Sequence, residues 1–320
     1  MRFLITGGAG FIGGHLTEQL LADGHEVIVV DNLSTGSRDN LQAVAGHRNL
    51  RFIEDDIVTM DGLGPLIAAS DVIFHLAAAV GVELVVNQPA RTIVTNVHGT
   101  ENVLLPAAEH GKRIIIASTS EVYGKSSKPL FHEADNLLIG APTHSRWGYA
   151  CSKLLDEFYL MALHQSHQLP GTVVRLFNTV GPRQTGQYGM VLPRFVHAAL
   201  RNEPLRVFGT GTQSRCFCHV QDTIRALRQL IDCPASCGQI YNIGSQHSIT
   251  ILELAQQVIA QLNSRSSIEM VPYDLAYGKG FDDMPRRKPD TMAIQKLLNW
   301  QPERSLATII DDVAASFRRQ

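Results

Sequence analysis

The sequence predicts an α/β fold built on a doubly wound parallel sheet, with a smaller C-terminal lobe interleaved with it. Three observations indicate this fold. From residue 2 to about residue 177, short apolar runs alternate with stretches of helical periodicity. The runs are apolar throughout rather than at every second residue, as expected for strands covered on both faces. A glycine-rich turn directly follows the first run, and the alternation breaks after Gly181.

The apolar runs of the first half predict six strands. They lie at Phe3 to Ile5, Val27 to Val30, Leu50 to Ile53, Val72 to Leu76, Arg113 to Ala117 and Thr172 to Leu176. The helical stretches between them have the character of crossover connections, which join parallel strands. After Gly181 we expect a helix around Val191 to Leu200, a turn at Phe208 to Gly211 and a late helix around Thr250 to Leu262.

These patterns predict two lobes whose segments interleave along the chain. Residues 1–178 with 212–243 are expected to form the larger lobe around the sheet. Residues 179–211 with 244–320 are expected to form the smaller one. Ligands of such folds bind at the carboxyl edge of the sheet, so the smaller lobe would complete a site there.

Composition excludes several classes of function. The chain has 320 residues, 44% of them hydrophobic, and a formal net charge of -2, which provides no basic surface for nucleic acid. No apolar stretch reaches the ~18 residues that a membrane span needs. Five cysteines without a secretory context predict reduced thiols and a cytoplasmic protein. Cys216 and Cys218 lie in the apolar, strand-like run up to Val220, so we predict core thiols and no metal.

The first turn has the pattern of a dinucleotide-binding loop. Residues 7–13 read Gly-Gly-Ala-Gly-Phe-Ile-Gly, between the first strand and an amphipathic stretch. Gly7 permits the tight turn, Gly10 lets the backbone approach a pyrophosphate at a helix N-terminus, and Gly13 lets that helix pack against the sheet. The sequence therefore predicts a Rossmann-like larger lobe.

Asp31 predicts which dinucleotide binds. It ends the second strand, 18 residues beyond Gly13, where a carboxylate accepts the ribose hydroxyls of adenosine and repels a ribose phosphate. Arg38 could reverse this preference but lies farther along the chain, where we expect it to face solvent or the adenine. NAD is therefore favoured over NADP.

Tyr149 and Lys153 are candidates for acid–base chemistry. They lie four residues apart in a stretch of helical pattern, so both side chains share one face. We expect the ammonium to lower the pKa of the phenol, which would then act as a base toward a sugar hydroxyl. The fifth strand is followed by Ser118-Thr119-Ser120-Glu121, which brings hydroxyls and a carboxylate to the same edge of the sheet.

With these motifs the chain resembles the extended short-chain dehydrogenase/reductase superfamily, over essentially its whole length. The motifs that carry the resemblance are the glycine loop, Asp31, Asp56-Ile57, His75-Leu76-Ala77-Ala78, Asn96-Val97-His98-Gly99-Thr100, the Tyr149/Lys153 pair and Gly181-Pro182-Arg183. The resemblance implies a tightly held NAD that takes hydride from the 4-position of a nucleotide-bound sugar. It also implies that Tyr149 removes the hydroxyl proton with help from Thr119.

The resemblance further implies a set of cofactor contacts. Asp56 would contact the adenine and Lys153 the nicotinamide ribose. The full implied set is Gly7, Gly10, Phe11, Ile12, Gly13, Asp31, Asn32, Asp56, Ile57, Leu76, Ala77, Ala78, Asn96, Ser118, Tyr149 and Lys153.

Within the superfamily, the chain is most similar to UDP-glucuronate decarboxylases. The shared signatures are Ser118 to Gly124, Leu138-Ile139-Gly140, Arg146-Trp147-Gly148-Tyr149, Phe177-Asn178, Tyr277 to Gly280 and Arg286 to Pro289. This similarity implies that Ser120, Glu121 and Arg287 surround the sugar carboxylate. It implies that Asn178 and Arg194 hold the sugar or the uridine diphosphate and that Arg215 binds phosphate.

Glu121 is the residue on which the reaction type depends. A carboxylate beside an anionic substrate would repel it, which would favour loss of carbon dioxide by destabilising the charged ground state. The same residue could instead deprotonate carbon 5 in a dehydratase, or it could simply anchor a loop.

Oxidation at carbon 4 leaves several reactions open. Oxidative decarboxylation of UDP-glucuronate is the leading interpretation, followed by 4-epimerisation of UDP-glucuronate or UDP-glucose and then by 4,6-dehydration. Met190 stands where the xylose-forming decarboxylases place an arginine, which argues against the substrate assignment. The segments Arg146 to Tyr149 and Phe177 to Gly186 also resemble bacterial 4-epimerases, which keeps epimerisation open. A non-enzymatic NAD sensor is the remaining alternative, against which the intact Thr119, Tyr149 and Lys153 argue.

Two further expectations concern histidines and assembly. None of the histidines is assigned a catalytic role, and His75 is expected to pack in the core or bond to the backbone. The amphipathic patterns at 97–110 and 150–166 predict helices that could form a two-fold, four-helix interface, so a homodimer is expected.

Overall fold

The computed structural model describes residues 1–186, 190–273, 275 and 284–319. Its centre is a seven-stranded sheet in the order β11-β6-β5-β4-β1-β2-β3, and the pairs across it are parallel. The strands are β1 (Arg2–Thr6), β2 (Glu26–Asp31), β3 (Leu50–Glu54), β4 (Val72–His75), β5 (Arg113–Thr119), β6 (Gly171–Leu176) and β11 (Gln239–Ile243). The six predicted strands all lie in this sheet, so the predicted α/β fold is confirmed.

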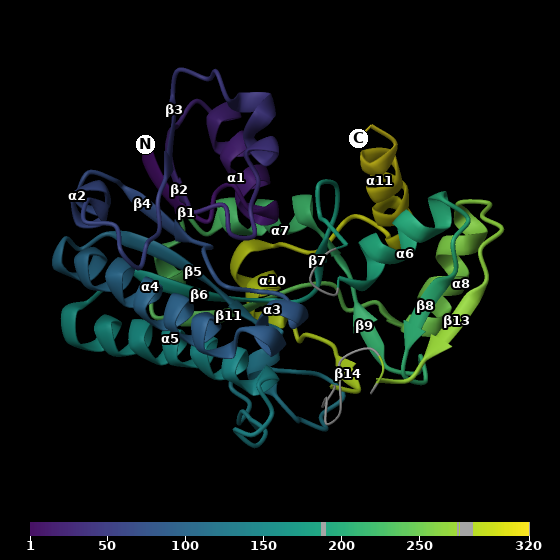
Figure 1. Cartoon of the computed structure of the whole chain (residues 1–320). Coiled ribbons are helices and arrows are strands. Elements are labelled where there is room, and N and C mark those ends of the chain that lie inside the picture. Colours follow the sequence, from purple (N-terminus) through teal and green to yellow (C-terminus); the bar gives the residue numbers. More distant parts are fainter. Residues whose placement is uncertain (187–189, 274, 276–283, 320) are drawn as a thin grey trace.

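Helices cover both faces of the sheet (Figure 1). They are α1 (Phe11–Ala22), α2 (Leu63–Ala68), α3 (Val82–Asn87), α4 (Pro89–Glu109), α5 (Arg146–His167), α7 (Val220–Gln229) and α10 (Met292–Leu298), with 3-10 turns η1 (Arg38–Val44), η2 (Ser120–Tyr123) and η4 (Pro234–Ser236). Chain order reverses between β1 and β4, which leaves a crevice at the carboxyl ends of these two strands.

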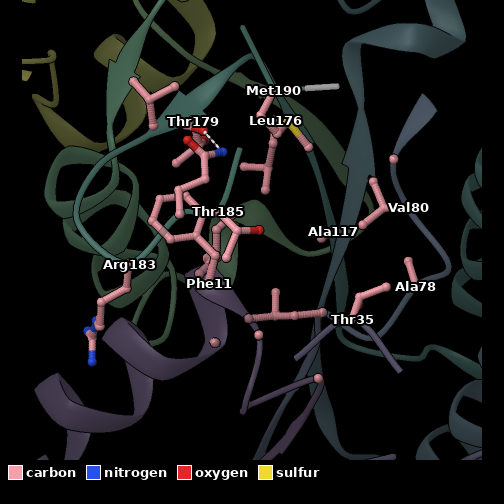
Figure 2. A pocket seen from close by; sticks show the side chains of 18 of the residues that line it. Phe11, Thr35, Ala78, Val80, Ala117, Leu176, Thr179, Arg183, Thr185 and Met190 are labelled. Carbon is pink, nitrogen blue, oxygen red and sulfur yellow. Dashed lines mark hydrogen bonds between the residues drawn. The ribbon is translucent and has the colours of Figure 1, made fainter. Parts of the chain in front are cut away.

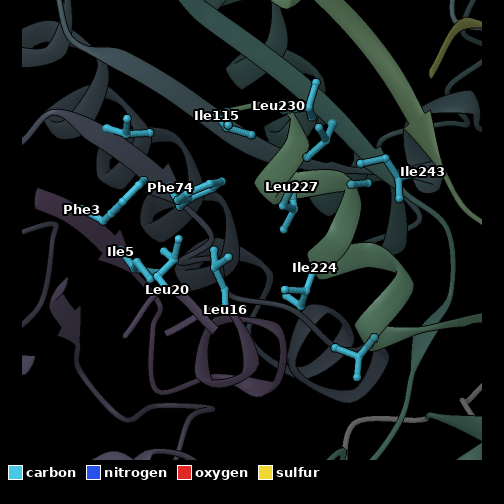
Figure 3. Close-up of a cluster of buried hydrophobic side chains, with 14 of the residues drawn as sticks. Phe3, Ile5, Leu16, Leu20, Phe74, Ile115, Ile224, Leu227, Leu230 and Ile243 are labelled. Atoms are coloured by element: carbon cyan, nitrogen blue, oxygen red, sulfur yellow. The ribbon is translucent and has the colours of Figure 1, made fainter. Parts of the chain in front are cut away.

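Two apolar layers hold the larger lobe together. On one face, Phe3, Leu16, Phe74 and Leu227 are completely buried between the sheet and helices α1 and α7 (Figure 3). On the other face, the sheet packs against α2, α4 and α5. Strands with both faces buried need apolar residues at successive positions, which is why the continuous runs predicted them correctly.

The smaller lobe lies beside the carboxyl edge of the sheet (Figure 1). Its elements are β7 (Thr179–Val180), α6 (Val191–Leu200), β8 (Leu205–Phe208), β9 (Ser214–Cys216), β10 (Cys218–His219), β12 (Ser248–Thr250), α8 (Ile251–Gln261), β13 (Ile268–Val271), β14 (Arg286–Arg287) and α11 (Leu306–Arg319). Helix α6 spans the residues predicted for it, and α8 lies within its predicted range. Helices α6, α8 and α11 share one core.

The predicted division into lobes remains a proposal, and packing argues for two changes to it. Strands β9 and β10 were expected in the larger lobe, but they pair with β12, β14 and β7 of the smaller one. The second change concerns segment 292–300. Ile294 of α10 and Trp300, which follows it, are buried in the same cluster as Phe3 of β1. The Trp300 indole nitrogen donates to the carbonyl oxygen of Asp222 in α7 at 3.0 Å. The segment 292–300 therefore packs as part of the larger lobe.

Candidate active site

A cavity of about 1490 Å³ lies at the carboxyl edge of the sheet, between the two lobes. Figure 2 shows part of its lining, where Phe11, Ala78, Arg183 and Met190 come from four different segments. All the residues predicted to bind cofactor, bind substrate or catalyse the reaction line this cavity, except Asn96. The signature Tyr277 to Gly280 lies outside the described residues.

The glycine loop has no room for side chains at two positions. Gly7 has a φ of 74°, and a Cβ there would lie 2.6 Å from the backbone nitrogen of Ala77. A Cβ at Gly13 would lie 2.2 Å from the carbonyl oxygen of Gly7. The loop therefore lets α1 begin at Phe11 with its N-terminus toward the cavity, an arrangement that suits a pyrophosphate.

Asp31 is fixed by the backbone around it. Its carboxylate accepts hydrogen bonds from the amides of Ala9 and Leu33, both at 2.9 Å, and burial raises its pKa. Arg38 does not line the cavity; its guanidinium lies 2.5 Å from Glu54 and 5.0 Å from the ring centre of Phe52. Arg38 is thus held away from Asp31, an arrangement that suits an unphosphorylated ribose.

The loop after β3 continues the cofactor end of the cavity. Asn32 donates to the carboxylate of Asp56 at 2.9 Å, and the same carboxylate accepts from the amide of Val58 at 2.9 Å. These bonds connect the ends of β2 and β3. They hold Asp56 and Ile57 at the cavity wall, where the sequence placed an adenine contact.

Asn96 is the one residue of the implied cofactor set that does not line the cavity. It is 1% exposed, its side-chain oxygen accepts from the Ala79 amide at 2.8 Å, and its nitrogen donates to Ser152 at 3.0 Å. Ser152 in turn donates to the carbonyl oxygen of Tyr149 at 2.8 Å. These bonds connect the loop after β4 with α5, and the cofactor contact implied for Asn96 stays a prediction.

Tyr149 and Lys153 line the cavity from the first turns of α5, as their spacing predicts. The pKa of Tyr149 is nevertheless raised, first by burial and then by the negative charge of Glu121. A hydrogen bond from Thr119 opposes this increase. The expectation of a lowered pKa is therefore wrong, because burial and the charge of Glu121 outweigh the bond from Thr119 and the charge of Arg287.

Ser118 lines the cavity, but its hydroxyl is used within the protein. It donates to Glu157 of α5, whose carboxylate lies 2.7 Å from the guanidinium of Arg175. The side chains of Glu157 and Arg175 are each 3% exposed, and the guanidinium carbon of Arg175 lies 4.8 Å from the ring centre of Tyr123. This buried pair fixes α5 against β5 and β6.

Glu121 is held between two arginines. Arg146 donates to its carboxylate from Nε and Nη2, both at 3.1 Å, and Arg287 donates from Nη1 at 2.7 Å. The Nε of Arg287 is buried and has no hydrogen-bond partner among the described residues. Arg146 was named within a sequence signature but was assigned no role. Its position three residues before Tyr149 was a usable signal, because this spacing places both side chains on one helix face.

This arrangement changes the charge argument for Glu121. A substrate carboxylate at this position would meet the positive charges of Arg146 and Arg287 as well as the negative charge of Glu121. We therefore withdraw repulsion as the main role of Glu121. The geometry instead makes it the residue that orients Arg146 and Arg287.

Pairing of two short strands brings Arg287 beside Arg215. In the parallel pair β9 and β14, Arg215 and Arg287 are register partners, and both line the cavity. Asn178, after β6, donates to the carbonyl oxygen of Cys216 at 3.1 Å. The guanidinium carbon of Arg194 lies 3.9 Å from the ring centre of Phe208. These side chains form the wall that the smaller lobe contributes.

The arrangement is that of a dinucleotide site extended by a second, arginine-rich site. Residues 3–244 match the model of the NAD dependent epimerase/dehydratase family. The chain belongs to this family. Its members act on nucleotide sugars, so the protein is an enzyme, and NAD is its cofactor.

Relatives of known activity match the chain over its whole length. A UDP-N-acetyl-alpha-D-glucosaminuronate decarboxylase of Bacillus cytotoxicus is 40% identical, over 99% of this chain and 98% of that protein. UDP-glucuronic acid decarboxylase 5 of Arabidopsis thaliana is 38% identical, over 99% of this chain and 89% of that protein. A UDP-glucose 4-epimerase of Thermotoga maritima, solved with UDP-glucose, superposes with a TM-score of 0.89 at 30% identity, covering 100% and 99% of the two chains.

The described residues contain neither a helix that could span a membrane nor a cluster that could hold a metal ion. None of the helices combines the length and hydropathy needed to cross a membrane. Within the same residues, His, Cys, Asp and Glu side chains form no cluster of three or more that could hold a metal ion.

Proposed function

We propose that the protein oxidises a UDP-linked uronic acid, UDP-glucuronate or its 2-acetamido counterpart, at carbon 4 and then releases its carboxylate as carbon dioxide. The observation that carries the proposal is the position of Glu121, Arg146 and Arg287. They place a carboxylate-binding group in the same cavity as Tyr149 and Lys153. The names of the relatives point to the same class of substrate.

NAD, which the glycine loop and Asp31 would hold, would supply the acceptor for the hydride of carbon 4 of the sugar. Tyr149 takes the proton of the 4-hydroxyl onto its phenol oxygen, to which Thr119 is hydrogen-bonded. Because the pKa of Tyr149 is raised, positive charge must stabilise the phenolate. Lys153, on the same helix face, is the side chain we assign to this role.

The second step breaks the bond between carbons 5 and 6 of the sugar. Its electron pair moves toward the 4-ketone, carbon dioxide leaves, and a proton is added to carbon 5. Arg287, whose Nε has no partner among the described residues, and Arg146 are assigned to orient the carboxylate. Ser120 is 1% exposed and follows Thr119, so we assign it to the wall beside the carboxylate. Arg215 and Arg194 are assigned to the diphosphate and the uridine, with Asn178 beside the sugar.

An epimerase remains the second candidate. Met190 lines the cavity where the xylose-forming enzymes have an arginine, and the Thermotoga maritima relative is named an epimerase. A 4,6-dehydratase would use Glu121 as the base at carbon 5. A sensor without activity is the non-enzymatic alternative, and the intact Tyr149 and Lys153 argue against it.

The test is incubation with UDP-glucuronate and with UDP-N-acetylglucosaminuronate, each labelled at carbon 6, with NAD present. Release of labelled carbon dioxide from either sugar, together with a product lighter by one carboxylate, is the expected result. UDP-galacturonate without gas would identify an epimerase. No change in any nucleotide sugar would overturn the proposal and favour a sensor.

We also propose that the protein is a cytoplasmic homodimer. Helices α4 and α5 pack together and expose apolar side chains: Ile93, Val94, Leu105, Leu155 and Phe158. Phe158 is 65% exposed, which is costly for so large an apolar residue on one open face. A second copy would cover these residues and form a four-helix interface. The five free cysteines support a reducing compartment.

A further inference from the structure

Lys153 has a close partner that the reaction scheme does not use. Its ammonium lies 2.7 Å from the carboxylate of Asp156, one turn farther along α5. The two side chains are only 3% and 2% exposed. Among the described residues, Lys153 is the only cation that pairs with Asp156. The nearby cation Arg175 pairs with Glu157 instead. A buried ion pair of this kind strongly disfavours loss of either partner.

A chain of hydrogen bonds leads from the end of β1 to Asp156. The Thr6 hydroxyl lies 2.7 Å from Nδ1 of His75, and Nε2 of His75 lies 2.9 Å from the Thr100 hydroxyl. Thr100 is hydrogen-bonded to the carboxylate of Asp156. Burial raises the pKa of Asp156, and the charge and hydrogen bond of Lys153 together with the bond from Thr100 oppose this increase and favour the anion. His75 is 1% exposed, and burial followed by the charge of Lys153 lowers its pKa to about 3, so it is neutral.

The ionised carboxylate of Asp156, at the end of this chain, decides which group donates in each hydrogen bond. An ionised carboxylate only accepts, so the Thr100 hydroxyl donates to Asp156. The oxygen of Thr100 then accepts from Nε2–H of His75, and Nδ1 of His75 accepts from Thr6. Each donor therefore points toward Asp156, which stabilises its negative charge in a buried place.

We propose that Asp156 is a positioning residue that fixes the ammonium of Lys153 in the cavity wall and keeps it charged. The chain Thr6–His75–Thr100 holds Asp156 as the anion that this role requires. The inference deepens the proposed function, on which it rests for the role of Lys153 beside Tyr149. Asp156 acts through Lys153 and does not touch the reacting atoms.

The charged groups around Tyr149 make the inference testable. Glu121 and Asp156 raise the pKa of the phenol, whereas Arg287 lowers it. If Asp156 only added negative charge, its removal would lower the pKa of Tyr149. If it keeps Lys153 charged, its removal lets the buried lysine lose its proton, and the pKa of Tyr149 rises instead. The two readings predict opposite shifts.

The first measurement is the pH midpoint at which Lys153 is methylated by formaldehyde and cyanoborohydride, followed by peptide mass spectrometry. The variants are Asp156→Asn, Asp156→Glu and, as a matched control, Glu101→Gln, which breaks the exposed pair with His98 on α4. We expect the midpoint to fall by about one pH unit or more in Asp156→Asn. It should recover largely in Asp156→Glu and stay unchanged in Glu101→Gln.

The second measurement is the pH profile of turnover. In Asp156→Asn the acidic limb should move to higher pH and turnover at pH 7 should fall at least about tenfold, with KM changed less than about twofold. An unchanged Lys153 midpoint, or an acidic limb moved to lower pH, would overturn the inference. If Asp156→Asn does not fold, Thr100→Val tests the same chain and should lower the midpoint by a smaller amount; an unchanged midpoint there would also overturn it.

The methylation midpoint needs no substrate. A wrong substrate assignment would therefore remove turnover in every variant while leaving the Lys153 result intact. Failure of the inference and failure of the proposed function are thus distinguishable.

Discussion

Replacing Glu121 with glutamine should separate the two steps of the proposed reaction. The substitution keeps the size of the side chain and removes its charge. In the structure this carboxylate accepts three hydrogen bonds from Arg146 and Arg287, at 2.7 to 3.1 Å. An amide offers one acceptor oxygen and turns its NH₂ group toward a guanidinium, so at least one arginine loses its place.

The size of the effect follows from the contacts that are lost. A hydrogen bond to a charged group contributes about 1.5–3 kcal/mol, and 1.4 kcal/mol corresponds to a factor of ten in rate. Loss of one such contact in the decarboxylation step therefore predicts a ten- to hundredfold slower release of carbon dioxide. The first step should be spared, because Glu121 raises the pKa of Tyr149 and its removal makes the phenol easier to ionise.

The assay is a single turnover followed by absorbance at 340 nm and by trapping of carbon dioxide. In Glu121→Gln the absorbance of reduced NAD should accumulate before gas appears, and the acidic limb of the oxidation step should move to lower pH. The wild-type enzyme should show little accumulation. Gas release at the wild-type rate, without a build-up of reduced NAD, would refute the role assigned to Glu121.

Three further predictions concern Tyr149, His75 and Asp31. Tyr149→Phe should reduce oxidation at least about a thousandfold in stopped-flow absorbance, whereas Tyr159→Phe on the same helix should retain it; a Tyr149→Phe variant near wild-type rate would exclude the assigned base. The pKa of His75 is about 3 in the folded protein, below its unfolded value of 6.5. Between these two pH values the unfolded chain binds a proton that the folded protein does not. The protein therefore loses stability as the pH falls from 6.5 toward 3. Urea unfolding of His75→Gln should show a loss of stability between pH 7 and 5 that is smaller by about 1–2 kcal/mol, and an equal slope would contradict the assignment. Asp31→Asn should weaken NAD binding about tenfold by calorimetry while improving NADP relative to NAD, and an unchanged preference would show that Asp31 does not choose the cofactor.

The larger lobe could be predicted from the sequence because its strands are continuous apolar runs of ordinary length. The run Cys216 to Val220 shows where this signal fails. It looked like one strand, but β9 and β10 divide it and α7 begins at Val220. The side chain of His219 caps that helix by accepting from the Gln221 amide at 3.0 Å, a local bond that outweighs the apolar pattern.

The site was predictable to the extent that its residues follow strand ends or share a helix face. Asn96 was assigned to the cofactor through the family resemblance, and sequence order does not show that its side chain also bonds to Ala79 and Ser152. Asp156 gave a usable signal, a carboxylate three residues after Lys153, but spacing alone does not show that the pair is buried. Arg215 and Arg287 are 72 residues apart, and only the pairing of β9 with β14 makes them neighbours.

The position of Arg215 and Arg287 on a small sheet, away from the helix that carries Tyr149, has an evolutionary consequence. If Arg215 binds substrate as proposed, changes around it on β9 would alter which anionic sugar is accepted while Tyr149 and Lys153 stay in place on α5. Arg287 on β14 is the link between the two parts, because its charge lowers the pKa of Tyr149. Selection could therefore exchange one sugar for another by replacing a few arginines, while the inherited oxidation chemistry stays in use. A fold divided in this way can host many activities that share one first step.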